Sequence, residues 1–257
     1  MLFLTLIALF ALGAMSASFV GVVVARLNTG QTFLTGRSRC DACTMPLSSL
    51  SLVPIISYLM SGGRARCCGT HLSLHAPLTE LLLGGLFVLA FIKLGPTPTL
   101  LFMLFALSAL LALVLYDLSH QILPSPLLAT FVTASAITGF LATPSLTAFL
   151  SSLPTTFLIA AILALIHFFS RGRAMGFADA PLAFGLALLV GPAALPGFIF
   201  SFWIGAIIGI VLLAQRPHGS RMGVEVPFAP YLAAGFLLAY FTQWNPFVFV
   251  ATFTAFQ

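Results

Sequence analysis

Asp117 and Asp179 are the residues in this sequence whose positions most need a chemical reason. Asp117 closes one long apolar run and Asp179 opens another. Two carboxylates about 3 Å apart cannot both ionise easily, so such a pair shares a proton. One carboxylate can then take a proton from water while the other donates to the carbonyl oxygen of a peptide bond. Helix capping is the alternative for each residue, because aspartate at a helix start accepts backbone N–H bonds.

The residues directly before Asp179 suit a loop that a peptide chain can approach. Gly176 and Ala178 are small, and Phe177 lies between them. Small side chains at these positions let a substrate backbone come close to the carboxylate. We therefore take Gly176, Phe177 and Ala178 as the candidate active-site loop.

Three further titratable residues lie near the ends of apolar runs. His120 follows Asp117 by three residues. It could tune that carboxyl group or be an ordinary loop histidine. Glu80 stands near the start of an apolar run and could support the site or cap a helix. His167 ends another apolar run, and we expect it at the membrane interface.

The composition indicates that membrane helices must position these residues. Of the 257 residues, 60% are hydrophobic and 6% are charged, whereas soluble domains carry about 25% charged residues. So few charges cannot cover a soluble surface, and disorder, collagen-like repeats and coiled coils are also excluded. The sequence predicts an all-α polytopic membrane protein embedded in a lipid bilayer.

The apolar runs predict about eight transmembrane helices. Their distribution divides the chain into three segments: a first span, a cytosolic subdomain and a membrane-embedded domain. The predicted spans are 1–25, 77–94, 98–116, 124–143, 146–169, 179–192, 195–214 and 227–256. We expect 1–25 to be a retained first span, because a cleaved signal peptide has its positive charge before the apolar run. Residues 26–76 form a small cytosolic subdomain that contains the cysteines, and residues 77–257 form the membrane-embedded domain.

The net charge of +5 is explained by membrane topology. If the first span runs from outside to inside, nine of the ten basic residues are cytosolic and only Lys93 is outside. Cytosolic loops of membrane proteins carry this excess of arginine and lysine. The pattern requires no nucleic acid as a partner. It places Asp117 and Asp179 at the cytosolic membrane boundary.

The segments around both aspartates resemble the prepilin peptidases, the type IV leader peptidases of the GxGD class of membrane aspartic proteases. The resemblance covers most of the chain in collinear order. It is carried by segments 17–27 (ASFVGVVVARL), 36–43 (GRSRCDAC), 72–80 (LSLHAPLTE), 117–125 (DLSHQILPS), 176–182 (GFADAPL) and 226–232 (VPFAPYL). Ala178 replaces the middle glycine of the family motif, and Pro181 replaces its lysine.

The resemblance implies an aspartic endopeptidase that cuts the basic leader from type IV prepilins or pseudopilins. The catalytic residues would be Asp117 and Asp179, and proteolysis would need no cofactor. The enzyme would lie in the bacterial cytoplasmic (inner) membrane, with its active site on the cytosolic side. Many members then methylate the new N-terminus with S-adenosylmethionine, an activity that the departures at Gly21, Ser51 and Leu52 put in question.

The cysteine region resembles the zinc ribbon of the family with one change. Two Cys-x2-Cys pairs supply four thiolates to a tetrahedral zinc in such a ribbon. The first pair, Cys40 and Cys43, is intact, but the second is replaced by the neighbours Cys67 and Cys68. Because adjacent cysteines seldom bind one zinc with good geometry, His71 is a candidate fourth ligand. Free thiols without metal, and a disulfide, are the alternatives.

Two other classes of function compete with the peptidase. One is a catalytically impaired pilin-assembly factor that still binds pilins. The other is a small-solute transporter, whose acids would lie near the middle of the membrane. Neither aspartate lies in the middle of a span, and no inverted repeat is evident.

Overall fold

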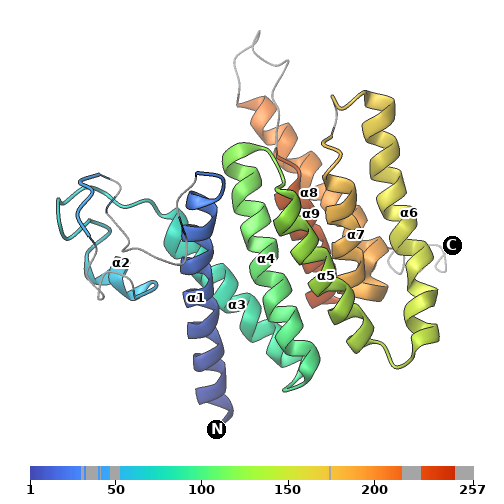
Figure 1. The fold of residues 1–257 in the computed structure, drawn as a ribbon, viewed down its shortest axis with the longest axis horizontal. Coiled ribbons are helices and arrows are strands. Elements are labelled where there is room, and N and C mark those ends of the chain that lie inside the picture. The colour runs from blue at the N-terminus through green and yellow to red at the C-terminus, as the bar shows by residue number, and fades with distance from the viewer. Residues whose placement is uncertain are drawn as a thin grey trace, which may run out of the picture. The chain divides into compact units, whose positions relative to one another are not determined.

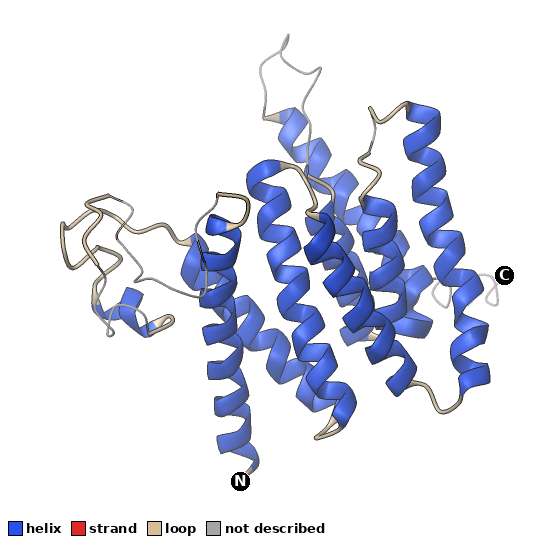
Figure 2. Cartoon of the chain, in the orientation of Figure 1, coloured by secondary structure: helices blue, strands red, loops and turns tan. Residues whose placement is uncertain are grey.

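The structure is a computed structural model, and it describes residues 1–29, 32, 40, 42–46, 53–173, 175–215 and 227–246 (Figure 1). The predictions that concern Ser51, Leu52 and most of segment 36–43 lie outside these residues. Helices make up the regular structure in the described ranges, apart from one isolated bridge between Arg64 and His71 (Figure 2). The all-α prediction is confirmed.

The helices follow the predicted apolar runs closely. They are α1 (Leu2–Arg26), α2 (Ile56–Met60), α3 (His75–Leu94), α4 (Pro98–His120), α5 (Ser125–Ala142), α6 (Leu146–Ser170), α7 (Asp179–Val190), the 3₁₀ helix η2 (Gly191–Ala193), α8 (Ala194–Ala214) and α9 (Ala229–Thr242). A helix satisfies its own backbone hydrogen bonds, which is why long apolar runs become helices in lipid.

Within the described residues, six helical segments are long and apolar enough to cross a membrane, fewer than the eight predicted spans. The difference lies in the last three apolar helices. Helix α7 has 12 residues and extends about 18 Å, less than the ~30 Å hydrocarbon core. It counts with η2 and α8 as one apolar segment of 36 residues, and α9, with 14 residues, is too short alone.

The chain divides into two compact units, Met1–Pro96 and Thr97–Gln257. In the first unit, α1 packs against α3. The contact is close, because a Cβ atom on Gly13 would lie 2.8 Å from the Cα atom of Gly84. Small residues allow this approach between apolar helices. The predicted division after residue 76 falls inside this unit, close to the start of α3.

In the second unit, α7 is the central helix. It contacts α5, α6, α8 and α9, and it is buried along nearly its whole length. Glycines permit this packing: a Cβ atom on Gly185 would lie 2.8 Å from the ring of Phe131 in α5. The C-terminal end of α4 and the N-terminal ends of α7 and α9 lie at the same end of this unit (Figure 1). The fold therefore brings together the helix ends that carry the two aspartates.

Candidate active site

Asp117 lies in the last turn of α4 and is buried, with 6% of its surface exposed. Its Oδ2 atom accepts a hydrogen bond of 3.2 Å from the backbone N–H of Ala229, the first residue of α9. The first N–H groups of a helix have no partner within the helix. Phe228, the N-cap residue of α9, supplies no side-chain bond. Asp117, which belongs to α4, therefore supplies a hydrogen-bond acceptor to the first N–H group of α9.

Asp179 is the first residue of α7 and is equally buried, at 6% exposed. Ala178 occupies the N-cap position, so Asp179 stands one residue inside the helix. Its carboxylate accepts a hydrogen bond from the backbone N–H of Gly176. Its own N–H donates to the carbonyl oxygen of Gly176 at 3.3 Å. The turn before α7 therefore holds both the backbone and the side chain of Asp179.

The two carboxylates are close enough to act on each other electrostatically. They come from α4 and α7, which are separated in sequence by α5 and α6. Helix α9 contacts both α4 and α7. Burial strengthens the interaction between charges because the surroundings are less polar than water. Two negative charges at such a site repel each other, so a state in which one of the two carboxyl groups keeps its proton is favoured.

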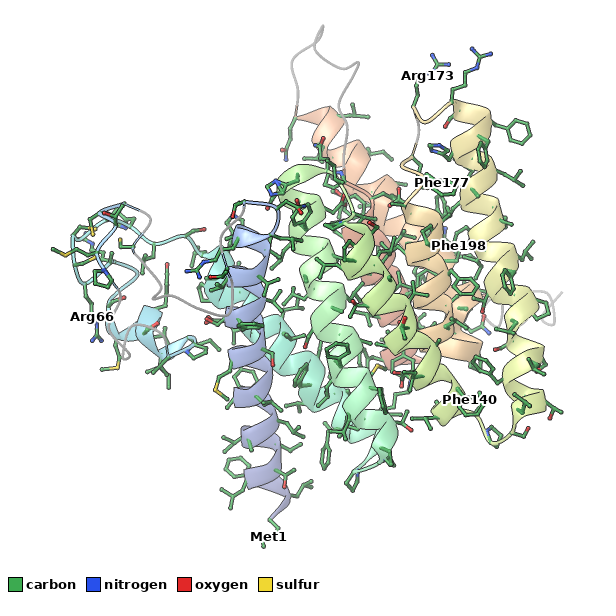
Figure 3. All side chains as sticks on the ribbon, viewed as in Figure 1. Met1, Arg66, Phe140, Arg173, Phe177 and Phe198 are labelled. Atoms are coloured by element: carbon green, nitrogen blue, oxygen red, sulfur yellow. The ribbon has the colours of Figure 1, made fainter. Side chains whose placement is uncertain are left out.

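The candidate loop of Gly176, Phe177 and Ala178 forms the turn into α7. A Cβ atom on Gly176 would lie 3.5 Å from Oδ2 of Asp179, an ordinary contact distance. Phe177 is 54% exposed, and Figure 3 shows it in the connection between α6 and α7. The loop thus combines a small residue against the carboxylate with an exposed aromatic ring beside it.

His167 contacts this loop, although the sequence indicated only an interfacial position for it. Its Nδ1 atom lies 2.9 Å from the carbonyl oxygen of Met175. Its ring packs edge to face against Phe177, with centroids 5.6 Å apart, and it interacts electrostatically with Asp179. The one available signal in the sequence was its place at the end of the helix that precedes the loop.

His120 and Glu80, the two candidate supporting residues, have different surroundings. His120 is the last residue of α4, and its exposed ring packs against Tyr116, with centroids 4.4 Å apart. Glu80 belongs to the first unit and is buried, at 7% exposed. Its Oε2 atom accepts a bond of 2.7 Å from the backbone N–H of Ile55, and it also bonds the Ser18 side chain. Glu80 thus joins α3 to α1 and to the residue before α2.

The four cysteines meet in one cluster. The Sγ atoms of Cys40, Cys43, Cys67 and Cys68 all lie within 4.8 Å of one another, and this group could hold a metal ion. All four are free thiols rather than disulfides. His71 is not a member of this group, and its backbone pairs with Arg64. Cys67, and not His71, completes this group of four.

Two backbone turns bring the thiols together. In the first, the N–H of Thr44 donates to the carbonyl of Cys40 at 2.8 Å; in the second, the N–H of Gly69 donates to the carbonyl of Ala65 at 2.7 Å. Hydrogen bonds within the cluster also change the acidity of the thiols. A hydrogen bond from the Thr70 hydroxyl lowers the pKa of Cys68 to about 6. Hydrogen bonding with Cys43 raises the pKa of Cys67 to about 12.

The two units match two family models in succession. Residues 11–94 match the Bacterial Peptidase A24 N-terminal domain, and residues 104–213 match the type IV leader peptidase family. The first match lies within the first unit, and the second lies within the second unit. No solved structure matches the chain significantly.

The chain is also similar to three proteins, each named prepilin leader peptidase/N-methyltransferase. The protein from Bacillus subtilis is 30% identical over 90% of this chain and 92% of its own length. The protein from Myxococcus xanthus is 34% identical over 83% of this chain and 65% of its own length. The protein from Klebsiella pneumoniae is 32% identical over 73% of this chain and 86% of its own length.

Fold and site together define an integral membrane protein of apolar helices with two buried aspartates at one end of its larger unit. The similarity to the Bacillus subtilis protein extends over nearly the whole of both chains. The chain belongs to the type IV leader peptidase family, and it is a membrane peptidase. The resemblance noted in the sequence is thereby confirmed. The matches give no support to a transporter or to an inactive assembly factor.

Proposed function

We propose that the protein cleaves the basic leader from type IV prepilins or pseudopilins at the cytosolic face of the bacterial inner membrane. The observation that carries this proposal is the buried pair Asp117 and Asp179, which two different helices bring within electrostatic reach. The relatives support it, because their names describe leader peptidases.

The proposed reaction uses one proton held by the pair. The ionised carboxylate takes a proton from a water molecule, and the resulting hydroxide attacks the carbonyl carbon of the scissile peptide bond. The protonated carboxyl group donates its proton to the carbonyl oxygen. As the tetrahedral intermediate collapses, the C–N bond breaks and the leaving amine takes a proton from the pair. One hydroxyl group of the intermediate returns its proton to the pair as the new carboxyl group forms, which restores the starting state. The proton is shared, so the titration belongs to the pair and not to one residue.

The cytosolic location is supported by the distribution of charge. The proposed topology places nine of the ten basic residues on the cytosolic side, as the positive-inside rule requires. A basic leader would remain on that side while the apolar part of its prepilin lies in the membrane. The scissile bond between them would then reach Asp117 and Asp179 at the membrane boundary.

The cysteine cluster supports a structural zinc ion as part of the proposal. Four sulfur atoms within 4.8 Å of one another fit a tetrahedral Cys₄ donor set. Cys40, Cys43, Cys67 and Cys68 would hold the ion and fasten the two turns to each other. The ion would stabilise the first unit and take no part in proteolysis.

A cleavage assay on the purified protein tests this function. A synthetic prepilin peptide with its leader is incubated with the protein in detergent, and the products are identified by mass spectrometry. We expect one cut between the leader and the mature sequence. Adding S-adenosylmethionine tests the second activity in the relatives' names, and methylation would raise the mass of the mature fragment by one methyl group. An intact peptide after incubation would contradict the proposed proteolysis.

A further inference from the structure

The imidazole of His167 is linked to Asp179 through a single peptide group. A carbonyl oxygen only accepts hydrogen bonds, so His167 must donate from Nδ1–H to the Met175 carbonyl, 2.9 Å away. That carbonyl belongs to the peptide bond between Met175 and Gly176. The N–H of the same peptide bond donates to the carboxylate of Asp179.

The geometry of a trans peptide makes this link directional. The described part of the chain contains no cis peptide bond, so the C=O and N–H of the Met175–Gly176 peptide point in opposite directions. His167 holds one side of the plane and Asp179 is bound on the other. A hydrogen bond to the carbonyl also polarises the N–H group and strengthens the bond that it donates.

The position of the His167 ring is itself fixed by its surroundings. A Cβ atom on Gly172 would lie 3.3 Å from Cε1 of His167, and Gly172 has a φ of +76°, which favours glycine. The N–H of Gly172 donates to the carbonyl of His167 at 2.9 Å. The rings of Phe168 and Phe177 each lie 5.6 Å from the imidazole, centroid to centroid. These contacts support the ring in the position from which Nδ1 reaches the Met175 carbonyl.

We propose that His167 is a positioning residue for Asp179, because its Nδ1–H fixes the Met175–Gly176 peptide whose N–H binds the Asp179 carboxylate. This inference rests on the proposed function. His167 acts on the orientation of a carboxylate in the reaction and not on the binding of the leader. Its loss should therefore lower kcat and leave KM nearly unchanged.

Two substitutions separate the hydrogen bond from the packing of the ring. His167→Phe keeps an aromatic ring against Phe168 and Phe177 but removes the donor. His167→Asn loses the ring but keeps an N–H donor close to the place of Nδ1. His75→Phe is a matched control, because His75 is an exposed histidine at the start of α3 in the other unit.

The assay is the cleavage of a prepilin peptide in detergent, with kcat and KM measured for each variant. We expect His167→Phe to lower kcat roughly tenfold, the effect of one lost hydrogen bond, with KM within about twofold. His167→Asn should recover most of that loss, and His75→Phe should match the unmodified protein. Equal kcat for His167→Phe and the unmodified protein would overturn the inference, as would a larger loss in His167→Asn than in His167→Phe.

Hydrogen exchange of the loop gives a readout that does not depend on activity. We expect faster exchange of the amides at 175–178 in His167→Phe than in His167→Asn, with unchanged exchange in α5. Uniformly faster exchange over the whole second unit would mean that the variant is unfolded and would overturn the local role. If the unmodified protein cleaves no prepilin peptide, the proposed function fails, while the exchange result still decides whether His167 holds the loop.

Discussion

The backbone N–H of Ala229 donates to Oδ2 of Asp117 at 3.2 Å, although the two residues lie 112 positions apart in sequence. This bond makes the start of α9 part of the surroundings of the aspartate pair. Helix α9 is in turn placed by close packing against α8. The position of Asp117 relative to its hydrogen-bond donor therefore depends on a helix contact that lies away from the site.

Gly235→Ala should weaken both folding and cleavage. Gly235 lies in α9, and a Cβ atom there would overlap the backbone nitrogen and hydroxyl of Ser201 in α8. Helix α9 must move to relieve this overlap, and such overpacking costs about 1–3 kcal/mol. The movement would shift Ala229 away from Asp117. We expect a lower melting temperature in detergent and a lower rate of leader cleavage.

Gly209→Ala is the matched control for this change. Gly209 lies in α8, and a Cβ atom there would have no neighbour within 4 Å apart from adjacent parts of its own helix. The substitution should leave cleavage unchanged and leave the melting temperature unchanged or slightly raised, because alanine favours helix. Equal melting temperatures and rates for the two variants would show that the α8–α9 contact does not place Ala229.

Asp117→Asn and Asp179→Asn should each abolish measurable leader cleavage while the protein still inserts into membranes. An amide cannot exchange the proton that the reaction needs, and general acid–base groups contribute about 10²–10⁴-fold in rate. Ser119→Ala is a suitable control, because Ser119 is exposed in the same turn of α4 and bonds the carbonyl of Leu115 within its own helix. Cleavage that survives in both asparagine variants would rule out the aspartate pair.

The helices could be predicted from the sequence because lipid leaves an apolar run almost no alternative to helix. Each of the eight predicted runs overlaps one of the helices α1 and α3 to α9, and several helices extend a few residues beyond their run. The break between α7 and α8 was also visible, since Gly191 and Pro192 interrupt the run. The sequence did not predict that α7 would be buried on all sides, because a helix that is apolar all round can face lipid or protein alike.

The candidate site was only partly predictable for a similar reason. Asp117 and Asp179 could be recognised because acids beside apolar runs are costly. The bond between His167 and Met175 depends on the path of the loop between α6 and α7, which no spacing rule gives. The cluster of Cys67 with Cys68 likewise depends on the turn at residues 65–70, which presents both neighbouring thiols to Cys40 and Cys43.

Glu80→Ala should loosen the first unit locally. The substitution would leave the N–H of Ile55 without its 2.7 Å partner, and a buried unpaired donor costs about 1–3 kcal/mol. Ile55 has a φ of +60°, an unfavourable value for a β-branched residue, so its conformation needs this support. We expect faster hydrogen exchange at residues 53–60 and a lower melting temperature.

Glu80→Gln tests whether the carboxylate oxygen or its charge matters. Glutamine keeps an oxygen acceptor for Ile55 and has the same length. In Glu80→Gln, the amides at residues 53–60 should exchange at nearly the rate of the unmodified protein. In Glu80→Ala they should exchange much faster. If Glu80→Ala exchanges these amides no faster than the unmodified protein, the bond to Ile55 does not hold the segment before α2.

Metal analysis of the purified protein should find one zinc ion per chain, held by the four thiolates. Cys40→Ser and Cys67→Ser should each lose the ion, because removing one thiolate leaves three ligands. His71→Ala should keep it, since His71 does not belong to the group of four. The serine variants should melt at a lower temperature than the unmodified protein. Removal of the zinc by a chelator should lower the melting temperature of the unmodified protein in the same way. If His71→Ala loses zinc and Cys67→Ser keeps it, the fourth ligand is the histidine.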